Sequence, residues 1–526
     1  MVRIHLYYFP PLRCLMKSLR HHLFIWVILG LAASVLSHAQ PEPEKPYDSV
    51  VLKTGQRQLF LDDFVLGDLF GVTRVIHPPA KYAGNPVIRP DRPSDGLVIQ
   101  MRDGPSWDEQ EKVWKVWYNR KGHFGNGWGS GFARSKDGIT WEKPDLGLVQ
   151  IDGNRLNNVV LVKDHPQAYL QHVMMDPTAA PDRRYKGMLG TDGRKAVVSA
   201  DGLTFTVLPV PPIPSQDESH LTWDDLQQQY LLTVKHNGPF GRAVYLSVSR
   251  DYEQWTPPTL IYNADAHDQT LAESFLHKIA ANERMYRPPI NHPREYIAEI
   301  YNMPIFTYEG IYIGLPTYFE SSGRIPPPAG NQDGISSVKL VTSRDLRTWT
   351  RVGDRRHFIP ISEMAPGVSD TGQILAASHP IRMGDELWFY YSGLNVRYRP
   401  KPADEPEPYF PYRGGICLAK LRLDGFASLH ADESGGFVET RPIRFDGHRL
   451  FINGEAAKGN IRAEVTDAAG RVVLEGWDTD QSEIVTGDQL RAELRWKGHD
   501  LQELHGKRVR LRFHLKNADL YSFWFE

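Results

Sequence analysis

Acidic, basic and amide side chains recur where β-strands are expected to begin. They are Arg102 and Asp103, Gln171 and His172, Asp217 and Glu218, Glu295 and Glu299, and Asp370. Carboxylates gathered in one concavity repel each other, so such a set needs a reason. One carboxylic acid with a raised pKa can protonate a leaving oxygen, while a second carboxylate acts as nucleophile or activates water. That division of work is what the cleavage of glycosidic bonds requires.

Roles within this set follow from position along the chain. The expected catalytic residues are Asp103, Asp217, Glu218 and Glu299. The expected substrate-binding residues are Arg102, His172 and Asp370. Glu218, with Asp217 beside it, is the predicted proton donor or the donor's partner, and Asp103 is the predicted nucleophile or base. Adjacent side chains of a strand point to opposite faces, so only one of the acidic neighbours can aim fully at a substrate.

One turn sequence is repeated four times. Its copies are Ser135-x-Asp137-Gly138-x-x-Trp141, Ser199-x-Asp201-Gly202-x-x-Phe205, Ser249-x-Asp251-x-x-x-Trp255 and Ser343-x-Asp345-x-x-x-Trp349. The Ser and Asp side chains can accept hydrogen bonds from turn N–H groups, and Gly supplies a permissive backbone. The aromatic ring is expected to pack between neighbouring repeats. We therefore expect the four turn Asp residues to be structural.

The elements around these turns predict an all-β chain. Each turn follows further strand-like runs, and a fifth unit keeps the strands without the Ser and Trp, which is typical of a five-bladed β-propeller over residues 47–435. Its inner strands would bring the polar set together, strands before Gly84 would help to close the ring, and Asp176 would be a hairpin turn residue. Residues 436–526 read as a C-terminal β-sandwich, and 271–284 as a weak helix.

This plan resembles glycoside hydrolases of family 32 and their relatives in families 43 and 130. Asn85-Pro86 is similar to the Asn-Pro that opens their first blade, and the stretch from Asp217 to Val234 resembles the Glu-Asp-Pro-Arg motif of family 130. The resemblance implies a hydrolase of oligo- or polysaccharides. A non-catalytic glycan-binding propeller is one alternative, since the Trp-Met-Asn-Asp-Pro, Arg-Asp-Pro and Glu-Cys signatures of family 32 are absent. A phosphorylase is another, with Arg102 as the basic candidate for phosphate.

Composition and the N-terminus limit the other function classes. The net charge of −2 argues against nucleic acid as a partner. Residues 1–39 read as a signal peptide, with either Met1 or Met16 as the start and a retained anchor as the alternative, so a secreted or periplasmic location is expected. Cys417 is then the only cysteine of the mature chain. His267, His277 and His292 do not have the spacing of zinc ligands. No cofactor is expected, although a calcium ion is possible.

Overall fold

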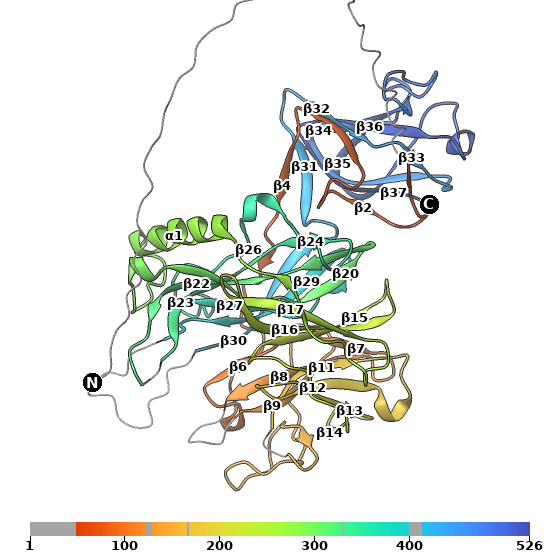
Figure 1. The fold of residues 1–526 in the computed structure, drawn as a ribbon. Coiled ribbons are helices and arrows are strands. Elements are labelled where there is room, and N and C mark those ends of the chain that lie inside the picture. The colour runs from red at the N-terminus through yellow and green to blue at the C-terminus, as the bar shows by residue number, and fades with distance from the viewer. Residues whose placement is uncertain (1–48, 122–127, 166–167, 329, 399–412) are drawn as a thin grey trace, which may run out of the picture. The chain divides into compact units, whose positions relative to one another are not determined.

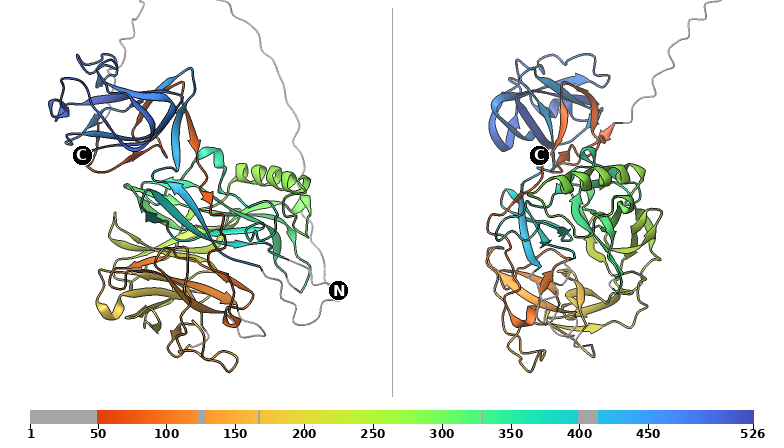
Figure 2. Two further views of the ribbon diagram at one scale, coloured as in Figure 1. Left: turned by 180° about the vertical axis from the view of Figure 1, so that it is seen from behind. Right: turned by 90° about the vertical axis from the view of Figure 1, so that its left-hand side faces the viewer.

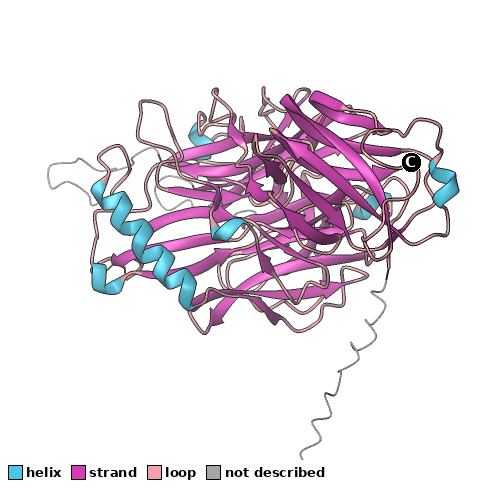
Figure 3. Ribbon diagram, turned by 90° about the horizontal axis from the view of Figure 1, so that it is seen from above, coloured by secondary structure: helices cyan, strands magenta, loops and turns pink. Residues whose placement is uncertain are grey.

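The computed structural model of the chain describes residues 49–121, 128–165, 168–328, 330–398 and 413–526. Most of its regular structure is β-strand (Figure 3). The α-helix of this part is α1 (Ala266–Ala281), which confirms the weak helical pattern. The short 3-10 segments are η1 (Pro93–Asp95), η2 (Pro181–Arg183), η3 (Pro293–Glu295), η4 (Gly353–Arg355) and η5 (Leu501–Leu504). The predicted signal peptide lies outside the described residues.

The first three blades follow one another along the chain (Figure 1). Blade 1 contains β6 (Val98–Gln100), β7 (Ser106–Asp108), β8 (Val113–Lys121) and β9 (Trp128–Ser135). Blade 2 contains β10 (Leu161–Val162), β11 (Leu170–Met175), β12 (Tyr185–Leu189), β13 (Lys195–Ser199) and β14 (Thr204–Val207). Blade 3 contains β15 (Ser219–Asp224), β16 (Gln229–Gly238), β17 (Gly241–Ser249) and β18 (Thr259–Tyr262). Both β6 and β7 pair with β8, so they are two halves of one inner strand, interrupted at residues 101–105.

Blade 4 consists of strands that are broken near their middles. They are β19 (Ile297–Asn302), β20 (Ile305–Tyr308), β21 (Ile311–Gly314), β22 (Thr317–Arg324), β23 (Gln332–Lys339), β24 (Val341–Ser343), β25 (Thr350–Arg351) and β26 (His357–Ile359). Because β19 pairs with β22 while β20 pairs with β21, the two halves of the blade hydrogen-bond separately. This blade completes the four that precede ring closure.

Blade 5 closes the ring by taking a strand from the N-terminal side. It contains β27 (Gln373–Ala376), β28 (Ile381–Met383), β29 (Glu386–Leu394), β30 (Gly414–Arg422) and β5 (Ala80–Lys81). The side chain of Asn85 exchanges two hydrogen bonds with the backbone of Leu418, at 2.9 and 2.8 Å. Both views of Figure 2 place the orange strands of blade 1 beside the cyan strands of blade 5. The structure thus confirms the predicted five-bladed propeller.

The repeated turn is built by its own side chains. Gly138 N donates to Ser135 Oγ at 2.9 Å, and the backbone N–H groups of Ile139 and Thr140 donate to Asp137 Oδ1 at 2.8 and 2.7 Å. The other copies form the same bonds, around Ser199 and Asp201, Ser249 and Asp251, and Ser343 and Asp345. The predicted structural role of these Asp residues is confirmed.

These turns also join neighbouring blades. Gly138 has a left-handed backbone with φ of 74°, which brings its carbonyl oxygen within 2.6 Å of the Tyr390 hydroxyl of blade 5. Trp141 Nε1 donates to the same oxygen at 3.1 Å. In the second copy, Gly202 has φ of 75° and accepts from Trp117 Nε1 of blade 1 at 2.7 Å. In the three copies that have tryptophan, the ring predicted for the seam also closes the turn through its N–H.

A second contact repeats between the blades. Tyrosine hydroxyls from the second strand of one blade donate to hairpin carboxylates of the blade before it, in the pairs Tyr185 with Asp108, Tyr230 with Asp176, and Tyr312 with Asp224. Asp176 also accepts from Thr178 N at 2.9 Å. Its predicted place in a hairpin turn is confirmed.

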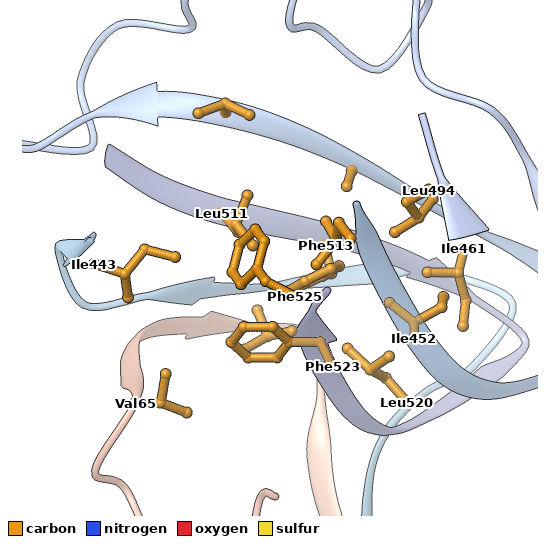
Figure 4. Close-up of a cluster of buried hydrophobic side chains, with 14 of the residues drawn as sticks. Val65, Ile443, Ile452, Ile461, Leu494, Leu511, Phe513, Leu520, Phe523 and Phe525 are labelled. Carbon is orange, nitrogen blue, oxygen red and sulfur yellow. The ribbon is translucent and has the colours of Figure 1, made fainter. Parts of the chain in front are cut away.

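The C-terminal strands form a β-sandwich from one long sheet. It contains β1 (Val50–Val51), β2 (Gln58–Leu59), β3 (Leu66–Phe70), β4 (Thr73–Ile76), β31 (Ala427–Ala431), β32 (Gly436–Thr440), β33 (Ile443–Arg444), β34 (Leu450–Asp467), β35 (Val485–Leu494), β36 (Val509–Lys516) and β37 (Ala518–Phe525). β34 pairs with β37 over residues 450–455 and with β36 over 460–467, so it takes part in both layers. Ile452, Ile461 and Phe513 are fully buried between them (Figure 4).

At the N-terminal and C-terminal ends of the predicted propeller segment, several strands belong to the sandwich sheet and not, as expected, to a blade. Strands β1 to β4 pair with sandwich strands, and only β5 of the segment before Gly84 joins a blade. β31 already belongs to the sandwich sheet, ahead of residue 436. The sequence could not reveal this, because an alternating strand looks the same whichever sheet supplies its hydrogen-bond partner.

Candidate active site at the propeller axis

A charged pair joins blade 1 to blade 3. Arg102, in the break between β6 and β7, donates from Nε to Glu218 Oε2 at 2.6 Å and from Nη2 to Glu218 Oε1 at 2.7 Å. Asn302, at the end of β19 in blade 4, donates to Glu218 Oε2 at 3.1 Å. Arg102 and Glu218 are each 4% exposed. The structure therefore brings two of the predicted site residues into direct contact.

This contact fixes the charge of Glu218. Burial by itself would raise the pKa of the carboxyl group, but the Arg102 guanidinium outweighs it, aided by Lys235 and Asn302, and lowers the pKa to about 2. A bidentate guanidinium–carboxylate pair is the strongest common form of charge-assisted hydrogen bond. Glu218 is accordingly ionised at neutral pH. The environment does not favour the predicted role of proton donor, and suits a carboxylate that stabilises positive charge.

Asp103 has the opposite environment. Its Oδ1 lies 3.0 Å from His172 Nδ1, while Oδ2 is buried and has no hydrogen-bond partner among the described residues. Burial raises the pKa of Asp103 well above its usual value, although His379, the nearby Val173 backbone, Ser378 and Arg102 oppose the shift. Burial, Arg194 and Arg102 lower the pKa of His172 well below its usual value. Asp103 therefore favours the protonated form, which fits an acid better than the predicted nucleophile or base.

His172 links Asp103 to Ser219 in an order that resembles a nucleophile with its base. Nε2 of His172 lies 2.8 Å from Ser219 Oγ. Yet Ser219 is 2% exposed, and its hydroxyl also contacts Arg194 Nε at 2.6 Å and Gln171 Oε1 at 2.7 Å. An enclosed oxygen that accepts from a guanidinium is a poor nucleophile. We interpret this chain as a network that positions His172 and, through it, Asp103.

The remaining predicted residues divide into two groups. The exposed Asp217 pairs with the buried Lys235, and Glu299 accepts from Arg242 Nη1 at 2.8 Å. Asp217 adjoins the charged pair, since it directly precedes Glu218 and its partner Lys235 acts electrostatically on Glu218. Glu299 is related to it through Arg242, which lies near the same Tyr301 ring as Lys235, at 5.7 and 4.1 Å from the centroid. Asp370 does not join them.

Asp370 lies in a seam of the ring. Its Oδ2 accepts from the Tyr391 hydroxyl of β29 at 2.8 Å and lies 2.6 Å from Lys81 Nζ of the outer strand β5. Lys81 also donates to the carbonyl of Pro360, which follows the outer strand of blade 4. The expectation that Asp370 binds substrate at the axis is therefore not supported by its contacts. It stands directly before an inner strand, but its side chain faces the neighbouring strands of blades 4 and 5.

A group of cations around two aromatic rings was missed by the sequence analysis. Lys235 Nζ lies 4.1 Å from the ring centroid of Tyr301, and Arg397 Cζ lies 4.5 Å from that of Phe319. Arg242 Cζ lies 5.3 Å from the same Phe319 ring. These cations come from second and third strands and from the segment after β29, whereas the prediction considered only the starts of inner strands. The sequence signal that could have revealed these cations is their position near the ends of hairpins that reach the axis.

No family model matches the chain, and neither does any curated protein sequence. Solved structures resemble its fold. A Bombyx mori β-fructofuranosidase of glycoside hydrolase family 32 is 10% identical, with 86% of this chain and 94% of that one covered at a TM-score of 0.38. A Coprinopsis cinerea family-62 α-L-arabinofuranosidase is 12% identical over 68% of this chain and 97% of that one, at 0.35. A putative Bacteroides ovatus glycoside hydrolase is 14% identical over 66% and 97%, at 0.38. Such low similarity identifies no activity.

Two further findings concern metals and membranes. Among the described residues, no group of three or more His, Cys, Asp and Glu side chains is placed to hold a metal ion. The possible calcium ion stays a prediction. No helix in the part of the chain that the structure describes combines the length and the apolar character needed to cross a membrane.

Proposed function

We propose that this protein is a carbohydrate-active enzyme that hydrolyses glycosidic bonds of oligo- or polysaccharides outside the cytoplasm. The observation that carries the proposal is the contrast between two buried acids: Arg102 binds Glu218 through two hydrogen bonds, while Asp103 Oδ2 has no hydrogen-bond partner among the described residues. Asp103 favours the neutral form, and Glu218, next to Arg102, favours the ionised form. Pairs of carboxyl groups with pKa values pushed apart are the mark of acid–base division in glycosidases.

In this proposal Asp103 transfers its proton to the glycosidic oxygen as the bond to the sugar carbon breaks. The ionised Glu218 stabilises the positive charge that develops on the sugar ring. Water supplies the hydroxyl group to the sugar carbon, and its remaining proton restores the acid form of Asp103. Arg102 keeps Glu218 ionised, and His172 orients Asp103.

Phosphorolysis is a second candidate that the cations favour. Lys235, Arg242 and Arg397 cluster around Tyr301 and Phe319, where the sequence had offered Arg102 alone. Arg242 Nη2 and Arg397 Nη2 both lie near Asn331 Oδ1, at 3.4 and 3.3 Å. Two guanidinium groups that share a neighbour can hold one phosphate ion between them. Here phosphate would replace water as the group that receives the sugar.

The test is to incubate the purified protein with a panel of plant, algal and fungal glycans, with and without inorganic phosphate. Hydrolysis predicts new reducing ends in phosphate-free buffer. Phosphorolysis predicts sugar phosphate, formed only when phosphate is present. Glycan binding without product across the whole panel would establish the non-catalytic alternative and overturn the enzyme proposal.

Two variants and a control assign the chemistry. Asp103→Asn removes the transferable proton, and Glu218→Gln removes the ionised group, so each should lower the rate by about 10² to 10⁴. Glu433→Gln changes an exposed carboxylate of the sandwich and should keep full activity. Full activity in both axial variants would show that the site lies elsewhere.

A further inference from the structure

A cavity of about 510 Å³ lies at the other end of the propeller axis, where inner strands finish. Its walls come from the ends of β7, β11, β15, β20 and β28, one from each blade. Its lining includes Trp107, Met175, Trp223, Phe306, His379 and Ile381. A volume between roughly 300 and 1,000 Å³ is typical of sites for small molecules. We call it the strand-end cavity.

The strand-end cavity is separate from the candidate active site. Arg102, Asp103 and Glu218 do not line it. His172 and His220 lie beside Arg102 on the axis, since their rings are 5.7 Å apart and His220 Nδ1 contacts the Arg102 carbonyl oxygen at 3.0 Å. The two regions adjoin each other, because His379 lines the cavity and acts electrostatically on Asp103, and Pro105 of the cavity wall lies two residues after Asp103. Occupancy of the cavity can therefore be tested without disturbing the charged pair.

Three indoles give the cavity its chemistry. Trp107 and Trp114 come from blade 1, with ring centroids 5.1 Å apart, and Trp223 comes from blade 3, edge-on to Tyr230 at 4.8 Å. All three indoles are partly exposed although most aromatic side chains of the propeller are buried. Trp114 and Trp223 also pack against buried clusters, so part of each indole stays in contact with water. A ligand with a flat apolar face would remove that surface from water.

Polar groups at the rim restrict the class of ligand. Thr222, Thr307 and Asp225 line the same cavity, on the side of blades 3 and 4. Thr307 donates its hydroxyl to Asp225, and a hydrocarbon chain would deprive the remaining acceptor sites of these groups of water without replacing it, which is unfavourable. A sugar ring instead offers an apolar face to an indole and hydroxyl groups to the rim. The neighbouring Asp225 carboxylate repels an anionic sugar, so a neutral one fits better.

We propose that the strand-end cavity binds neutral saccharide units of a glycan chain, as a second carbohydrate site on the opposite end of the axis from the candidate active site. This inference shares the substrate class of the proposed function and is independent of whether the bond is cleaved. The walls from blades 1 and 3 stack on the sugar ring, and the threonine hydroxyls and Asp225 bind its hydroxyl groups. Such a site would hold a long glycan on the protein between catalytic events.

The test is a titration of the full-length protein with cellotriose, xylotriose, mannotriose and laminaritriose, followed by tryptophan fluorescence and calorimetry. At least one trisaccharide should bind. Trp223→Ala and Trp223→Leu should both weaken it roughly tenfold or more, because leucine restores apolar area without an aromatic face. Trp255→Phe, in a turn outside the cavity, should leave the affinity unchanged, and circular dichroism checks that each variant is folded.

Glu218→Gln separates this proposal from the proposed function. It should lower turnover and leave unchanged the part of trisaccharide binding that depends on Trp223. Absence of turnover in the natural protein would count against the proposed enzyme, and not against the cavity. Binding that depends on Glu218, or that Trp223→Leu preserves, would overturn the proposal. So would a cavity that takes an aromatic probe such as 4-nitrophenol but none of the four trisaccharides.

Discussion

Arg102 and Glu218 are 116 residues apart in the sequence, yet two hydrogen bonds of 2.6 and 2.7 Å join them across the propeller axis. The pair connects blade 1 to blade 3, so it passes over blade 2. It can form only after three blades have assembled in the correct order. The candidate active site is therefore a product of ring formation rather than of any single blade.

Removing one member of this pair should destabilise the protein more than removing both. Arg102→Met leaves Glu218 charged and buried without its cation, which should lower the free energy of unfolding by about 3–5 kcal/mol. Arg102→Met combined with Glu218→Leu should recover part of that loss. Urea unfolding measures both, and Arg134→Met, which breaks an exposed pair with Glu142, should change stability by less than about 1 kcal/mol. If the single and the double variant lost the same free energy of unfolding, Arg102 and Glu218 would not form a buried ion pair.

Asp103→Asn should stabilise the protein at neutral pH while it lowers activity. The pKa of Asp103 is raised in the folded state, so the unfolded chain releases a proton that the folded chain retains, and stability falls as pH rises above about 4. Asparagine has no such proton. The gain in melting temperature over the natural protein should therefore shrink as pH approaches 4. A pH-independent difference would show that Asp103 is ionised in the folded protein.

Glu218 should oppose acid unfolding. Its folded pKa of about 2 lies below the ordinary value for glutamate, so its stabilising effect is complete above about pH 4.3 and is lost as pH falls toward 2. Glu218→Gln should flatten this part of the stability profile. Thermal unfolding measured at several pH values provides the comparison, with Glu433→Gln as a control that keeps the natural profile. If the stability of Glu218→Gln fell with decreasing pH as steeply as that of the natural protein, Glu218 would not be held in an ionised pair.

Gly138→Ala should destabilise the repeated turn and spare the chemistry. Its φ of 74° is strained for alanine, and a Cβ there would lie 2.7 Å from the Tyr390 hydroxyl oxygen. Gly147→Ala is the matched control, because φ is 69° and nothing lies within 4 Å. Strain should cost each variant about 1–2 kcal/mol, and Gly138→Ala should lose more through the seam. Equal melting temperatures for the two variants would mean that the turn does not hold the blades together.

Deletion of residues 436–526 should yield an aggregated protein rather than a soluble propeller. Strands β2 and β3 would lose their partners β37 and β32, and the buried sandwich cluster that includes Val65 and Leu66 would face water. Size-exclusion chromatography distinguishes the outcomes. A soluble, monomeric fragment would show that the N-terminal strands do not depend on the sandwich.

The sequence by itself determined the repeating architecture and its turns. A Ser-x-Asp turn depends on hydrogen bonds within six residues, and strand alternation is local, so both are legible without a structure. Asp137 and Asp176 could be separated from catalytic candidates for the same reason. The expectation that polar residues of the inner strands converge on the axis also brings Arg102, Asp103 and Glu218 together, although Arg102 and Asp103 lie in the break between β6 and β7 rather than at a strand start. Their catalytic roles stay predictions.

Only the tertiary structure decided the charge of each group and the partner of each strand. Asp103 and Glu218 have similar side chains, but burial raises the pKa of Asp103, whereas the hydrogen-bonded Arg102 guanidinium lowers that of Glu218. Asp370 turned into a seam because Tyr391 and Lys81 meet it there. Segment 50–76 joined the sandwich rather than the ring, since strand pairing is a long-range choice that alternation does not encode.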